Sequence, residues 1–158
     1  MIKNRNIDPT AAIAVSKMEE GAMTFVDTQL TNAQVLVLAT TAGEVIVAAP
    51  GANKAIIVHA VWIVADASDT AWTEPSAPDD LVVQYAGGTD ITAAIESGAL
   101  VANSVNLAKY GVLDTELLPV ANEAIHLFNT GANWGGGDTA NTMSVRTWYS
   151  VVDTVAFK

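Results

Sequence analysis

The 158-residue chain contains no cysteine. Disulfide bonds, zinc sites built on thiolates and a cysteine nucleophile are therefore excluded. Basic residues are scarce: lysine and arginine number seven, against 17 aspartates and glutamates, and the formal net charge is −10. Proteins that bind nucleic acid neutralise phosphates with clustered basic side chains. The composition therefore predicts no nucleic-acid partner.

Long apolar runs are also missing. The most apolar stretch, Ala55–Ala65, is interrupted by His59 and is too short to span a bilayer. The opening "MIKNRNIDPT" carries charge but no apolar run follows it, so it does not match a secretory signal peptide. We expect no membrane partner, and synthesis as a soluble protein in the cytoplasm of the producing cell.

Apolar residues are abundant, but most of them are small. Hydrophobic residues make up 51% of the chain and charged residues 15%, and much of the hydrophobic share is alanine and valine. The length fits one domain with its own core. Such an apolar fraction predicts that some surface is buried against neighbouring chains.

Short segments rich in β-branched and aromatic residues alternate with turn signals along the chain. This pattern predicts strands at 22–31, from Glu44 to the Pro50-Gly51 turn, and at 54–66, 81–86, 122–131 and 142–153. Two segments fit either a helical turn or a strand, namely 31–40, which Thr31 or Asn32 could cap as a helix, and 91–111.

We predict a single-domain, all-β fold, a β-sandwich of the jelly-roll type, over residues 22–158. Residues 1–21 are predicted to form a separate N-terminal arm, with a frayed terminus as the equal alternative.

The segment 54–66 is the strongest predicted strand. Simple alternation places Ile57, Val61 and Ile63 on one face. The opposite face then holds the remaining large apolar side chains, Ile56, Val58, Trp62 and Val64. A strand of a small antiparallel domain usually has one wet face. Two apolar faces predict a second covering layer, and another subunit could supply it.

The stretch "NTGANWGGGDTANT", residues 129–142, poses the question of a phosphate-binding loop. A P-loop needs a lysine after its glycines, whereas Gly137 and then Asp138 follow Gly136 here. A dinucleotide-binding loop opens a helix, whereas an alternating strand follows this one. We therefore interpret the stretch as a flexible hairpin turn between the last two strands.

Catalytic chemistry has few candidates in this chain. His59 and His126 are the only histidines, and hydrogen-bonded core or interface positions are the favoured interpretation over a shared site with a loop acid. Asp66 and Asp69 could hold Ca²⁺, but the EF-hand pattern is missing and solvated loop acids are favoured. We predict no enzyme, no catalytic or metal site and no cofactor.

Tryptophans supply the candidate partner contacts. Trp72 and Trp134 stand in predicted loops, where exposed rings can stack on sugars or anchor a partner. Trp62 is predicted to lie in the core or an interface, and Trp148 is ambiguous on the polar side of the last strand. Lys3 and Arg5 of the arm complete the set of candidate contacts.

Several segments occur in an order that resembles a known family. The "APGANK" turn enters the long apolar strand, "DTAWTEPSAPDD" precedes "LVVQYAGG", and "NEAIHLFNTG" is followed by "GGGDT" and by "MSVRTWYSVVD". Over about residues 30–155 the chain resembles the jelly-roll decoration (cement) proteins of tailed bacteriophages.

The resemblance implies a homotrimeric β-sandwich on the exterior of a virion. Its expected partners are other copies of itself and the major capsid protein, whose adjacent subunits it would clamp. Two alternatives stay open: a phage tail or fibre component, and a carbohydrate-binding β-sandwich module that uses Trp72 and Trp134.

Overall fold

The computed structural model describes residues 22–40, 43–67, 70–75, 80–102, 107–113 and 118–155. The predicted arm, with Lys3 and Arg5, lies outside these ranges, as does Asp69. The described residues form strands and two short helices, α1 (Asn32–Val35) and α2 (Gly98–Ala102).

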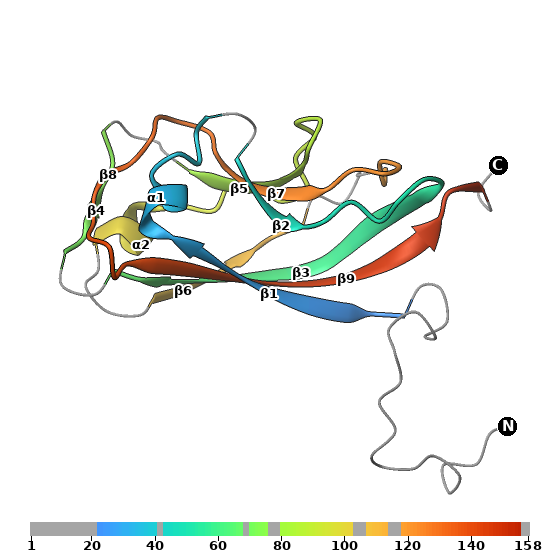
Figure 1. The fold of residues 1–158 in the computed structure, drawn as a ribbon, viewed down its shortest axis with the longest axis horizontal. Helices are drawn as coiled ribbons and strands as arrows, with labels where there is room; N and C mark the ends of the chain where they lie inside the picture. Colours follow the sequence, from blue (N-terminus) through green and yellow to red (C-terminus); the bar gives the residue numbers. More distant parts are fainter. Residues whose placement is uncertain are drawn as a thin grey trace, which may run out of the picture.

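Two antiparallel sheets face each other (Figure 1). The larger sheet has the strand order β1-β9-β3-β6, made of β1 (Thr24–Thr31), β9 (Thr142–Asp153), β3 (Lys54–Asp66) and β6 (Leu107–Gly111). The smaller sheet has the order β2-β7-β5, made of β2 (Glu44–Val47), β7 (Ile125–Asn129) and β5 (Leu81–Tyr85). This confirms the predicted all-β sandwich, while the jelly-roll topology stays a prediction.

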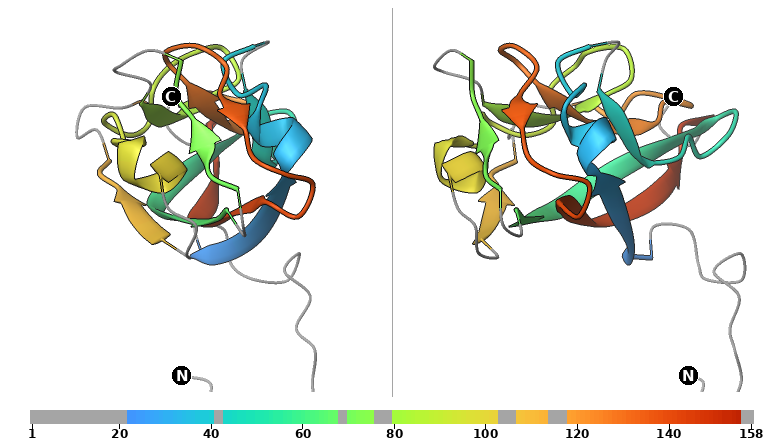
Figure 2. Two further views of the ribbon diagram at one scale, coloured as in Figure 1. Left: turned by 90° about the vertical axis from the view of Figure 1, so that its left-hand side faces the viewer. Right: turned by 60° about the vertical axis from the view of Figure 1, so that its left-hand side comes forward.

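A third, two-stranded sheet of β4 (Trp72–Thr73) and β8 (Gly135–Gly136) lies across one end of the sandwich (Figure 2). The segment 31–40 adopts the helical alternative: Thr31 precedes α1, and its backbone N–H donates to the Gln34 side chain at 3.1 Å. The segment 91–111 is mixed, with isolated bridges, then α2, then β6.

A bulge in β3 changes the predicted faces of that strand. The pairing with β9 shifts between Val58 and Ala60, so His59 is an extra residue on β3. The core side of β3 therefore holds Ile56 and Val58 before the bulge and Val61 and Ile63 after it, all buried. Simple alternation across the whole strand, as predicted from the sequence, is wrong at this point.

The core fills the space between the two sheets. Each strand contributes alternate residues, because successive side chains of a strand point to opposite faces. Leu127 of β7 and Met143 and Val145 of β9 are buried in this way, whereas all five residues of β5, Val83 among them, are buried. The second face of β3, with Trp62 and Val64, is only half-buried, so the smaller sheet covers one face of β3 and not both.

One buried hydrogen bond joins the two sheets directly. The Tyr85 hydroxyl on β5 donates to the backbone oxygen of Ile56 on β3 at 2.5 Å. The Tyr85 side chain is fully enclosed, and this burial raises the pKa of its hydroxyl above the ordinary value of 10.0. Tyr85 therefore adds a buried polar contact between the layers, in addition to the partly buried hydrogen bond that the Thr28 hydroxyl on β1 donates to the Ile46 carbonyl on β2 at 2.9 Å.

We expect Tyr85→Phe to lower the free energy of unfolding by about 1 kcal/mol near neutral pH, because a buried hydrogen bond is lost. Since the folded-state pKa is raised, the wild type keeps the Tyr85 contribution below pH 10.0 and loses it as pH rises through the folded pKa. Urea unfolding at about pH 8 and about pH 11 measures both. A wild-type advantage that does not shrink at the higher pH would contradict this account.

Candidate functional site

Trp72 and Trp134 are not surface residues. Their side chains are only 2% and 3% exposed, and the two ring centroids lie 6.1 Å apart at an interplanar angle of 45°. The pairing of β4 with β8 brings the two loops together, so that the rings pack on each other at the end of the sandwich. The prediction that both rings lie exposed on loops for a partner or a sugar is wrong.

The glycine-rich stretch encloses Trp72. The Trp72 indole N–H donates to the side-chain oxygen of Asn32 at 2.6 Å. Gly137 passes over this contact with a φ of 67°, and a Cβ there would lie 2.5 Å from the Asn32 oxygen and 2.7 Å from the Trp72 nitrogen. The glycine at this position is required by packing and by backbone conformation.

The same stretch is neither a phosphate cradle nor a hairpin. The Gly137 N–H donates to the Ala71 carbonyl, and the Asp138 carboxylate accepts from the N–H of Ala140. β7 and β9, which the stretch connects, belong to different sheets, and the stretch pairs with β4 on the way. The predicted hairpin is therefore corrected to a crossover between layers.

The two histidines lie on different sheets. His59, at the bulge of β3, is exposed, and its Nε2 lies 2.9 Å from the Ser150 hydroxyl on β9. His126 is half-buried on β7. The expected hydrogen-bonded role fits His59. Its exposure contradicts the core alternative, while the interface alternative stays a prediction. Within the described part of the chain, no three His, Asp or Glu side chains are grouped to hold a metal ion.

The side of the larger sheet that points away from the core carries a patch of aromatic and polar side chains. Cross-strand pairing arranges it in rows, with Phe25 beside Trp148, Asp27 beside Arg146, and Gln29 beside Ser144. On the other side of β9, β3 adds one residue to each row. We call this set the outer face: Phe25, Asp27, Gln29, Ser144, Arg146, Trp148, Ala60, Trp62 and Val64.

A two-pronged ion pair lies at the centre of the outer face. Arg146 Nε donates to Asp27 Oδ1 at 2.6 Å and Nη2 donates to Oδ2 at 2.7 Å. The guanidinium also lies over two rings, 4.8 Å from the centroid of Phe25 and 5.7 Å from that of Trp148. The hydrogen bond from Arg146 holds the pKa of Asp27 below its ordinary value.

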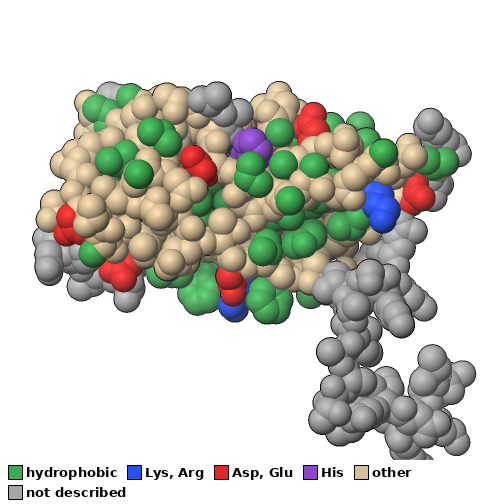
Figure 3. Space-filling model, in the orientation of Figure 1, with side chains coloured by type: hydrophobic (Ala, Val, Ile, Leu, Met, Phe, Trp, Pro, Cys, Tyr) green, Lys and Arg blue, Asp and Glu red, His purple; other side chains and the backbone are tan. Residues whose placement is uncertain are grey.

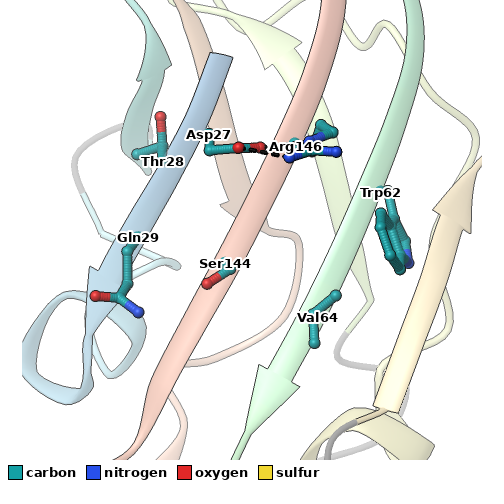
Figure 4. A pocket seen from close by; sticks show the side chains of 7 residues that line it. All are labelled: Asp27, Thr28, Gln29, Trp62, Val64, Ser144 and Arg146. Carbon is teal, nitrogen blue, oxygen red and sulfur yellow. Dashed lines mark hydrogen bonds and ion pairs between the residues drawn. The ribbon is translucent and has the colours of Figure 1, made fainter. Parts of the chain in front are cut away.

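A hollow of about 420 Å³ opens beside this pair. Figure 4 shows its lining along three neighbouring strands, with the Trp62 indole on one side and the Asp27–Arg146 pair on the other. Val64, Ser144 and Gln29 continue the lining along the strands. The hollow thus combines an apolar ring with polar groups.

The outer face is accessible in the single chain. Phe25 is 54% exposed and Met23, just before β1, is 63% exposed. In Figure 3 a basic and an acidic side chain lie between hydrophobic ones at the lower edge of the molecule. Exposed apolar groups around an organised charge pair can bind a partner.

Sequence reasoning found part of this face. Trp148 was placed on the polar side of 142–153 with an ambiguous role, and Arg146 lies on that same side. Phe25 and Asp27 could not be recognised as site residues from the sequence, because their place beside Arg146 depends on the pairing of β1 with β9. Trp62, predicted in the core or an interface, lies half-buried at the hollow.

Among the described residues, no helix has the length and apolar character needed to cross a membrane.

Comparisons with known proteins give one partial likeness. No family model matches the chain, and no curated protein matches it. A chain of the solved structure "Cyanophage Pam1 capsid asymmetric unit" is similar to this chain with a TM-score of 0.44 and 18% sequence identity, covering 94% of this chain and 99% of that one. A TM-score of this size does not establish a shared fold.

Substitution of Gly137 tests the packing around Trp72. Gly137→Ala should destabilise the protein more than Gly51→Ala, because both residues have positive φ but a Cβ at Gly51 would meet nothing within 4 Å. We expect the strain common to both to cost about 1–2 kcal/mol, and the clash at Gly137 to add about 1–3 kcal/mol. Thermal unfolding measures both variants. Equal losses would show that Trp72 does not depend on the close approach of Gly137.

Proposed function

We propose that this chain is a structural protein of a virus particle, a capsid decoration protein that binds the outer surface of the shell as a homotrimer. It would stabilise the shell by clamping adjacent subunits of the major capsid protein, without catalysis and without a cofactor. The family resemblance over about residues 30–155 supports this proposal from the sequence.

The outer face is the observation that carries the proposal. The cores of protein interfaces are enriched in aromatic residues, methionine and arginine and depleted in other charged residues. The outer face has this composition, with Phe25, Trp62, Trp148 and Arg146, and Met23 adjoins it. A β-sandwich that presents such a face is suited to binding another protein.

Repetition makes weak contacts sufficient for such a role. Each contact that removes apolar surface from water contributes roughly 25 cal/mol per Å², and a trimer engages several contacts at once, so that its avidity exceeds that of any single one. The net charge of −10 suits a position on the exterior of a particle, away from the packaged nucleic acid.

Purified particles of the virus that carries this gene test the proposal. We expect the protein to copurify with them in high copy number, and light scattering of the isolated protein to give about three times the 16.4 kDa mass of one chain. Particles that lack the protein should lose their contents at a lower temperature.

Absence of the protein from purified particles would contradict the proposal. A stable monomer in solution would remove the homotrimer. Antibody labelling on the tail would instead select the phage tail or fibre alternative.

The hollow favours one further candidate, a carbohydrate-binding module. A flat indole beside amide, hydroxyl and carboxylate groups can stack on a sugar ring and bond its hydroxyls. In the hollow these groups are supplied by Trp62, Gln29, Ser144 and Asp27, respectively. Because Trp72 and Trp134 are buried, the sugar would bind at the hollow and not at the loops.

A glycan array of neutral oligosaccharides tests this candidate. We expect binding to be lost in Trp62→Ala and kept in Trp148→Ala, since Trp148 lies on the same face but does not line the hollow. A wild-type chain that binds no glycan on the array removes the candidate.

A further inference from the structure

The outer face has two complementary parts. Phe25, 54% exposed, projects from β1 at the edge of the sheet. One row away, the hollow of about 420 Å³ opens between the Asp27–Arg146 pair and Trp62. Interface hot spots are built from aromatic and arginine anchors that fill pockets on the partner. This face therefore carries both an anchor and a pocket.

Charge distinguishes this face from the rest of the protein. The chain carries a net charge of −10, so two copies repel each other over most of their surfaces. On the outer face the one carboxylate, Asp27, is neutralised by Arg146 at hydrogen-bond distance. Another acidic protein can therefore approach the outer face without electrostatic repulsion between facing carboxylates.

Other exposed apolar side chains do not combine these features. The others are 41–83% exposed, and none of them belongs to a strand of the larger sheet: Val37, Val45, Val112, Leu118 and Val155. Scattered single apolar residues are normal on a protein surface and indicate no partner.

We infer that the outer face is the contact between copies of this chain, with Phe25 of one copy entering the hollow of the next. The inference rests on the proposed homotrimer and names the surface that forms it. The proposed contact runs in one direction, from Phe25 of one copy to the hollow of the next. Such a heterologous contact can close into a ring, as a trimer requires, whereas a two-fold contact that inserts both Phe25 rings at once would give a dimer. The entering ring would lie between Trp62 and the guanidinium of Arg146.

Sedimentation equilibrium of the full chain with matched variants tests the contact. We expect Phe25→Ser, which removes the anchor, and Trp62→Ser, which removes one wall of the hollow, each to raise the dissociation constant of the oligomer by roughly tenfold or more. Val45→Ser should leave it unchanged, because Val45 is 49% exposed, similar to Phe25, but lies on the smaller sheet. Circular dichroism of each variant verifies that the fold is intact.

The absence of cysteine allows an independent measurement that leaves the anchors in place. Gln29→Cys introduces a thiol on the outer face and Val45→Cys introduces one on the other sheet. In the oligomer we expect a thiol reagent to modify position 29 several-fold more slowly than position 45. The difference should vanish when the Phe25→Ser change is added.

The outcomes separate this inference from the proposed function. Variants that stay oligomeric, with position 29 fully reactive, would overturn the inference and leave the decoration role standing. Variants that stay oligomeric but no longer bind particles would assign the face to the capsid and also overturn it. An oligomer that depends on Phe25 but is absent from particles would uphold the inference and refute the proposed function.

Discussion

The pairing of β3 with β9 is the constraint on which the rest of the structure depends. The two strands are antiparallel from Lys54 opposite Asp153 to Asp66 opposite Thr142. β9 also pairs with β1, so it lies inside the larger sheet and its alternation decides which side chains face the core. A one-residue slip of this ladder would move every apolar side chain of β9 to the wrong face.

The bulge at His59 has two effects on which side chains of β3 face the core. It keeps Ile56 and Val58 in the core together with Val61 and Ile63, although simple alternation separates them. The same shift turns Trp62 and Val64 away from the core, and on the outer face they line the hollow. The bulge therefore places on the outer face apolar side chains that a regular strand would have buried.

Electrostatics and apolar burial act together on the outer face. The Asp27–Arg146 pair is exposed, so by itself it adds little to folding stability. Its main effect is to neutralise the charge of the guanidinium, which lies over the Phe25 and Trp148 rings. On a strongly acidic chain, such a neutral aromatic surface is where association is least opposed.

The sequence by itself determined the strands and their class. The patterns over 81–86, 122–131 and 142–153 predicted strands there, and the missing lysine after Gly136 argued against a phosphate loop. Alternation is a local property of the backbone, so it can be recognised without the fold.

Only the tertiary structure decided which residues of β3 face the core on each side of the bulge, and that Trp72 and Trp134 are buried. It also brought Asp27 to Arg146, which is 119 residues away in the sequence. These features depend on which strands pair and in what register, and that is set by contacts between distant segments. Local sequence patterns do not indicate which distant segments make those contacts.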